Sequence, residues 1–214
     1  MQISSLLGGA DQLLPTFLSD LYRWGRSYVL RSTKLGAFEV LNYESTLEIM
    51  DVEGKHGKFN KVEKVRFIQN NVVAVQDQLW GFKKSITDYK CSPGAPVDFY
   101  QVGYKTYVVI SLREVKSKDD EEIFIFQWNL CGKPIIRFGF WETNIDRFTQ
   151  NLHLKIIFPE DRPPIRLCMI EVNHNRTIKL DKIKLTQLPD KQWQIAWESN
   201  TPRLNETFTM KWEW

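Results

Sequence analysis

Apolar and polar residues alternate with a period of two through most of this 214-residue chain, as they do in β-strands with one buried face. Short segments rich in glycine, proline and charge separate the alternating runs. The runs that predict strands are 38–50, 65–69, 104–115, 121–130, 134–142, 152–158, 166–173, 193–198 and 207–214. Because no helical pattern lies between them, they predict a mainly β protein, an antiparallel β-sandwich or open barrel of about ten strands.

A different period marks the start of the chain. Between Pro15 and about Arg31, large apolar residues recur at steps of three and four, which places them on one face of a helix. They are Phe17, Leu18, Leu21, Trp24 and Tyr28. The sequence therefore predicts an amphipathic N-terminal helix within 1–32 that packs on the rest of the chain or on a second copy. One β domain follows over 33–214, with a subdivision in the polar stretch near 144–151 as the alternative.

Four of the eight tryptophans lie in the last two predicted strands. The faces that bear these rings carry Trp193, Ile195 and Trp197 in one strand and Met210, Trp212 and Trp214 in the other. A sugar or base platform would need rings in water among polar groups, so the apolar neighbours favour core packing. We expect Trp197 and Trp212 to lie deepest, Trp214 to be partly exposed, and each indole N–H to find a partner.

Composition indicates the class of the protein and the cellular compartment to expect for it. Hydrophobic residues at 43% and charged residues at 26% are ordinary for a folded protein, and a net charge of +3 is too small to demand a polyanionic partner. Three widely spaced cysteines, Cys91, Cys131 and Cys168, lie in or beside apolar runs and predict reduced thiols. The first residues do not resemble an export signal, and no apolar run reaches 18 residues. We therefore predict a soluble cytoplasmic protein without stable membrane insertion.

Catalytic motifs with recognisable spacing are absent from the sequence. It contains no G-x-S-x-G, H-E-x-x-H, C-x-x-C or G-x-G-x-x-G motif and no P-loop. The prediction is accordingly that the protein is not an enzyme and uses no cofactor. An enzyme whose site is assembled from distant residues is the third alternative.

Two loops offer candidate binding residues. Asp51, Glu53 and His56 cluster within 51–58 and could present oxygen and nitrogen ligands, although a solvated hairpin tip explains the same pattern. The second loop, 159–164, presents its charged side chains from a backbone stiffened by prolines. Those side chains are Glu160, Asp161 and Arg162. The alternative is that the prolines only prevent edge pairing.

Basic residues concentrate in 55–66 and 176–191 and provide candidate phosphate contacts. Those of the first stretch are Lys55, Lys58, Lys61, Lys64 and Arg66. Lysine-rich strand edges that discourage aggregation look the same in sequence.

Taken together, these patterns favour a non-catalytic interaction module that binds another protein or itself. Its predicted surface is formed by the loops 51–58, 91–98 and 159–164, with the N-terminal helix as a further contact. A nucleic-acid-binding β protein that uses the two lysine-rich stretches is the alternative.

Overall fold

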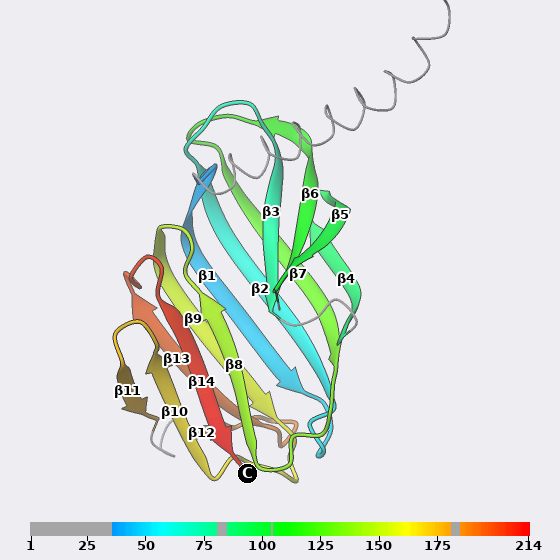
Figure 1. Ribbon diagram of the computed structural model, residues 1–214, viewed down its shortest axis with the longest axis vertical. Coiled ribbons are helices and arrows are strands. Elements are labelled where there is room, and N and C mark those ends of the chain that lie inside the picture. Colours follow the sequence, from blue (N-terminus) through cyan, green and yellow to red (C-terminus); the bar gives the residue numbers. More distant parts are fainter. Residues whose placement is uncertain (1–35, 81–84, 104, 181–184) are drawn as a thin grey trace, which may run out of the picture.

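The computed structural model describes residues 36–80, 85–103, 105–180 and 185–214 (Figure 1). This part of the chain forms fourteen strands and no α-helix. The strands are β1 (Phe38–Ile49), β2 (His56–Phe67), β3 (Val72–Trp80), β4 (Ile86–Ser92), β5 (Ala95–Val102), β6 (Lys105–Lys116), β7 (Glu121–Cys131), β8 (Phe138–Asn144), β9 (Thr149–Phe158), β10 (Arg166–Glu171), β11 (Arg176–Lys179), β12 (Leu185–Gln187), β13 (Trp193–Asn200) and β14 (Thr207–Glu213). The mainly β prediction is confirmed, with more strands than expected.

The strands form three sheets. The largest has the order β12-β13-β9-β1-β2-β7-β4, the second β11-β10-β14-β8 and the third β3-β6-β5. Neighbouring strands are antiparallel except β1 and β9, which are parallel. None of the three sheets closes into a barrel within the described ranges.

Both smaller sheets pack on the same face of the large sheet. Phe59 and Lys61 are two residues apart on β2 and so point to one side. The Phe59 ring meets Trp141 of β8 with centroids 5.4 Å apart, and the Lys61 ammonium pairs with Asp77 of β3. The second and third sheets therefore lie side by side over the large one, as Figure 1 shows for β8 and β3.

Several strands escaped the sequence analysis. Strand β2 begins at His56 and not at residue 65, and β3, β4, β5, β11 and β12 were not predicted. The inward faces of β2 and β3 carry the buried charged residues Lys61, Glu63 and Asp77, which interrupt the apolar alternation. The stretch 91–98 is also mostly strand and not a loop, because only Pro93 and Gly94 separate β4 from β5.

The tryptophan prediction is confirmed for burial and partly wrong for hydrogen bonding. Trp197 and Trp212 are 9% and 3% exposed, whereas Trp214 is half-buried. The Trp193 indole donates to the Glu160 carbonyl at 3.1 Å. The indole N–H groups of Trp212 and Trp214 are buried without a partner among the described residues.

The N-terminal helix lies outside the described residues, and the subdivision near 144–151 stays a prediction. The three cysteines are free thiols, with Cys131 exposed and the other two half-buried. In the described ranges, no helix is long and apolar enough to cross a membrane. The cytoplasmic location and the partner protein stay predictions.

Candidate functional site

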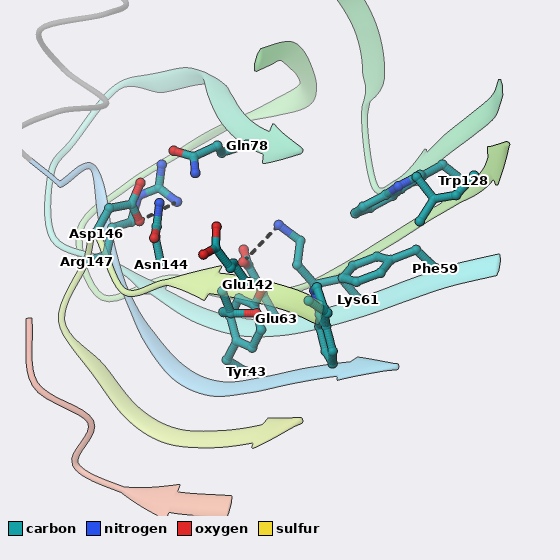
Figure 2. Close-up of a pocket in the computed structure, with 13 residues that line it drawn as sticks. Tyr43, Phe59, Lys61, Glu63, Gln78, Trp128, Glu142, Asn144, Asp146 and Arg147 are labelled. Atoms are coloured by element: carbon teal, nitrogen blue, oxygen red, sulfur yellow. Dashed lines mark ion pairs between the residues drawn. The ribbon is translucent and has the colours of Figure 1, made fainter. Parts of the chain in front are cut away.

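A cavity of about 70 Å³ lies where the two smaller sheets meet over the large one. Its walls come from β1, β2 and β7 of the large sheet, from β8 and the segment after it, and from β3. Figure 2 shows aromatic rings at one end, polar groups at the other, and a lysine with its carboxylate between them. The cavity thus joins elements of all three sheets.

The aromatic end is built by cross-strand packing. Phe59 and Trp128 are register partners on β2 and β7, and their rings stack with centroids 4.1 Å apart. Trp141 of β8 closes this end by meeting Phe59 edge to face. Such ring pairs are rigid and present negative faces to nearby groups. The Trp128 indole N–H is buried and has no hydrogen-bond partner within the described part of the chain.

The centre of the site is a buried ion cluster around Lys61. Its ammonium pairs with Asp77 and lies 3.2 Å from Glu63, and the three side chains are at most 6% exposed. Tyr89 donates to the second oxygen of Asp77 at 2.9 Å, and the Phe126 ring lies 4.4 Å from the ammonium. A buried charge is tolerated when it is paired in this way, although this cluster holds two carboxylates for one ammonium.

The Lys61 ammonium and the Tyr89 hydroxyl keep their protons over the physiological pH range. Burial alone would lower the pKa of Lys61, but Asp77 and then Glu63 raise it above the usual lysine range. Burial, followed by the charge of Asp77, raises the pKa of the Tyr89 hydroxyl. Lys61 therefore stays protonated and Tyr89 neutral, so neither is a general base or a nucleophile near neutral pH.

The polar end of the cavity forms its mouth. Asn144 is the last residue of β8 and Asp146 lies in the segment after it, and Figure 2 shows Gln78 and Arg147 beside them. Arg147 lies 3.9 Å from the Asp146 carboxylate, donates to the Gln76 carbonyl at 3.1 Å and lies over the Phe38 ring. The Asp146 side chain is 54% exposed. The polar end of the cavity is therefore open to solvent, whereas the ion cluster of Lys61 is buried.

Carboxylates outnumber cations around this cavity. The four carboxylates of Glu63, Asp77, Glu142 and Asp146, of which all except Asp77 line the cavity itself, are accompanied by three cations. These are Lys61 and Arg147 in the cavity wall and Lys105, which borders Glu142 in an adjoining pocket. The Glu142 carboxylate accepts a long hydrogen bond of 3.3 Å from the Thr209 hydroxyl. The local charge is thus negative beside aromatic faces, which suits a cationic group.

The structure places the predicted loop residues outside this site. Asp51 organises its own turn, because its carboxylate accepts from the backbone N–H groups of Glu53, Lys55 and His56 at 2.7–3.1 Å. The His56 ring lies 2.9 Å from the same carboxylate. Although partial burial raises the pKa of Asp51, these donors lower it further, so the net shift is downward. Asp51 therefore serves as a turn-forming residue here.

The charged side chains of the proline-rich loop lie apart from one another. Glu160 pairs with Lys191 at 3.3 Å, whereas Asp161 is exposed at the turn. Arg162 donates to the carbonyls of Val52 and Ile136, and its guanidinium stacks 3.9 Å from the Trp214 ring. Arg162 thus ties three segments together at one end of the molecule.

The five basic residues near β2 do not share a face. Lys61 points inward and is buried, whereas Lys58, Lys64 and Arg66 point outward from the same strand. Lys64 and Arg66 both pair with Glu121, and Lys55 pairs with Glu53. This arrangement divides the predicted phosphate-binding stretch, and Lys61 cannot reach a polyanion.

Most of the cavity was not predicted from the sequence. Lys61, one of its lining residues, was singled out for a different role. The available signal was that two consecutive inward positions, Lys61 and Glu63, are charged on an otherwise apolar strand face. Among the described residues, no group of three or more histidine, cysteine or acidic side chains is placed to hold a metal ion.

Comparisons with known proteins return partial structural similarities only. No protein-family model and no curated protein matches the chain. Among solved structures, it is similar to an M1 zinc metallopeptidase from Deinococcus radiodurans bound to a Tyr-Ser-Ala peptide, with 8% identity and a TM-score of 0.47. It is also similar to Legionella pneumophila aminopeptidase A in complex with aspartic acid, with 10% identity and a TM-score of 0.48.

These similarities cover part of the other proteins. The match takes in 82% of this chain and 42% of the metallopeptidase chain, and 83% of this chain and 21% of the aminopeptidase chain. The similar structures belong to enzymes, and this finding contradicts the predictions of a non-catalytic interaction module and of a protein that is no enzyme.

Proposed function

We propose that the chain binds a ligand with a primary ammonium group and that this group enters the cavity between β2, β7 and β8. The observation that carries the proposal is the excess of carboxylates around a small cavity with aromatic walls. Glu142 and Glu63 supply acceptors, and the rings of Trp128 and Phe59 supply the apolar wall for the adjoining methylene groups.

The size of the cavity supports a small cationic end group. A cavity of about 150 Å³ holds benzene, so a volume of about 70 Å³ has room for an alkylammonium head and not for a sugar ring or nucleobase. An anion is disfavoured because the ammonium of Lys61 is already engaged by Asp77 and Glu63. A neutral group would leave the excess negative charge uncompensated.

Calorimetric titration with propylammonium, and with 1-propanol as a neutral ligand of similar shape, tests the proposal. The wild-type chain should bind propylammonium and show no measurable binding of 1-propanol. Glu142→Gln keeps the shape of the side chain and removes its charge, and should weaken propylammonium binding about tenfold to a hundredfold, since a hydrogen bond to a charged group contributes about 1.5–3 kcal/mol.

The matched control is Glu160→Gln, which removes an exposed carboxylate from the loop after β9. It should leave propylammonium affinity unchanged. Equal binding of propylammonium and 1-propanol, or equal losses in the two variants, would contradict the proposal.

A further inference from the structure

The outer face of the second sheet carries an open pocket of about 570 Å³ that shares no lining residue with the carboxylate-rich cavity. This sheet, of order β11-β10-β14-β8, forms the lower left of the molecule in Figure 1. Leu167 and Met169 of β10 pack in the core, so Cys168 between them points outward into the pocket. The same alternation along β14 turns Lys211 outward.

Two lysines flank Cys168 on the neighbouring strands. Cys168 is the register partner of Lys211 on β14 and of Lys179 on β11, so the three residues form one row across the sheet. Neighbouring strands lie about 4.8 Å apart, which places the two lysine backbones about 10 Å from each other. Both lysines are exposed, and neither has an ion-pair partner in the described part of the chain. Their ammonium groups can therefore converge on one anion above Cys168.

Cations outnumber carboxylates on this face. Among the described residues that line the pocket, Glu213 supplies the one carboxylate. The cations that line it are Arg166, Lys179 and Lys211. Glu213 is already engaged, since it accepts from Arg137 at 2.8 Å and lies 3.4 Å from Arg166. The two lysines therefore leave a positive charge uncompensated, and this charge attracts anions.

Apolar side chains form the rest of the wall. Phe138 and Ile165 are 65% and 54% exposed, and the buried Leu167 and Leu180 lie beside them in the lining. Exposed apolar residues that gather within a polar rim are typical of a ligand-binding groove. An ion pair with an exposed lysine contributes little by itself, so a ligand needs the apolar contact as well.

We propose that this pocket binds an amphiphilic anion, a small molecule with one anionic head group on an apolar chain or ring. The head group lies above Cys168 between Lys179 and Lys211, and the apolar part packs toward Phe138 and Ile165. A pocket of about 570 Å³ is larger than the cavity of about 150 Å³ that holds benzene, so it has room for a chain of eight carbons. The site is independent of the ammonium site and selects the opposite charge.

Methyl NMR during addition of octanoate tests the site, with 1-octanol and acetate as reference ligands. Octanoate should shift the methyl resonances of Ile165 and Leu180, which line the pocket, and leave that of Ile123 on the large sheet unchanged. Acetate lacks the apolar chain and should cause no measurable shift. Because 1-octanol lacks the charge, it should bind about fivefold to thirtyfold more weakly than octanoate.

A pair of double variants separates this site from general attraction to a basic protein. Lys179→Gln with Lys211→Gln should weaken octanoate binding about fivefold to thirtyfold and leave 1-octanol binding unchanged. Lys90→Gln with Lys118→Gln causes the same change in net charge at exposed positions outside the second sheet and should bind octanoate as the wild type does. The proposal is overturned if Ile165 and Leu180 do not respond to octanoate, if 1-octanol binds as tightly as octanoate, or if both double variants lose affinity equally.

Discussion

Strands β14 and β2 bury opposite kinds of side chain. Strand β14 turns Phe208, Met210 and Trp212 inward, and its aromatic rings pack on the large sheet, as in the 5.7 Å contact between Phe158 and Trp212. Strand β2 turns Lys61 and Glu63 inward, and the Lys61 ammonium pairs with both Glu63 and Asp77. Apolar burial stabilises the first region without directionality, whereas the second depends on every charge having its partner.

The largest expected effect comes from breaking the charged region. Lys61→Met should lower the free energy of unfolding by about 3–5 kcal/mol, because Asp77 and Glu63 would remain buried without a cation. Urea denaturation measures the loss. Lys64→Met on the exposed face of β2, whose ammonium pairs with Glu121, should change stability by less than about 1 kcal/mol.

A combined variant sharpens this prediction. Adding Asp77→Asn to Lys61→Met removes one of the two uncompensated carboxylates and should recover part of the lost stability. Similar small losses for Lys61→Met and Lys64→Met would mean that burial of the Lys61 cluster does not govern its energetics.

The aromatic region should be most sensitive to added volume. Gly139 of β8 lies directly beneath the Trp212 ring, and an added Cβ would come within 2.1 Å of its Cε2 atom. Gly139→Ala should therefore displace the ring and lower the free energy of unfolding by about 1–3 kcal/mol. The near-UV circular dichroism of tryptophan should weaken in parallel. Gly132→Ala is the control, since a Cβ there meets nothing within 4 Å.

A smaller, pH-dependent effect should come from Glu206, a buried carboxylate satisfied mainly by backbone groups. It accepts from the N–H groups of Asn173 and Thr207 at 2.8 and 3.0 Å and pairs with His174. Burial raises its pKa, but these donors lower it further, so the folded-state pKa lies below the usual value. Its contribution is complete above the unfolded-state pKa of about 4.3 and is lost as pH falls through the folded-state value.

The measurement is the pH dependence of unfolding between neutral and acid pH. The wild-type chain should lose part of its stability below about pH 4.3, and Glu206→Gln should be less stable at neutral pH with a flatter acid limb. An identical acid limb in both proteins would assign acid unfolding to other carboxylates.

The same comparison explains what could be predicted from sequence. Apolar and polar residues alternate strictly along the sequences of strands such as β13 and β14. Their strand period and the burial of Trp197 and Trp212 were therefore predictable. The first half of β2 and all of β3 were not, because Lys61, Glu63 and Asp77 occupy inward positions that a pattern of apolar residues treats as exposed. The candidate cavity was missed for the same reason.

Which buried charged residues meet could not be predicted from the sequence either. Asp77 lies 16 residues from Lys61 on a strand of another sheet, and Glu142 reaches the cavity from a third. Nothing in the local pattern around these residues indicates that they meet. Only the packing of the two smaller sheets on one face of the large sheet brings them together.

The central claim is that the carboxylate-rich cavity with its aromatic end receives an ammonium group. Its most direct test is a ¹⁵N–¹H spectrum of the tryptophan indole groups during addition of propylammonium, with 1-propanol as the reference. The account predicts saturable shifts for Trp128 and Trp141, which line the cavity, and none for Trp193 and Trp214, which do not. Unchanged resonances of Trp128 and Trp141, or equal shifts of all four indoles, would contradict it.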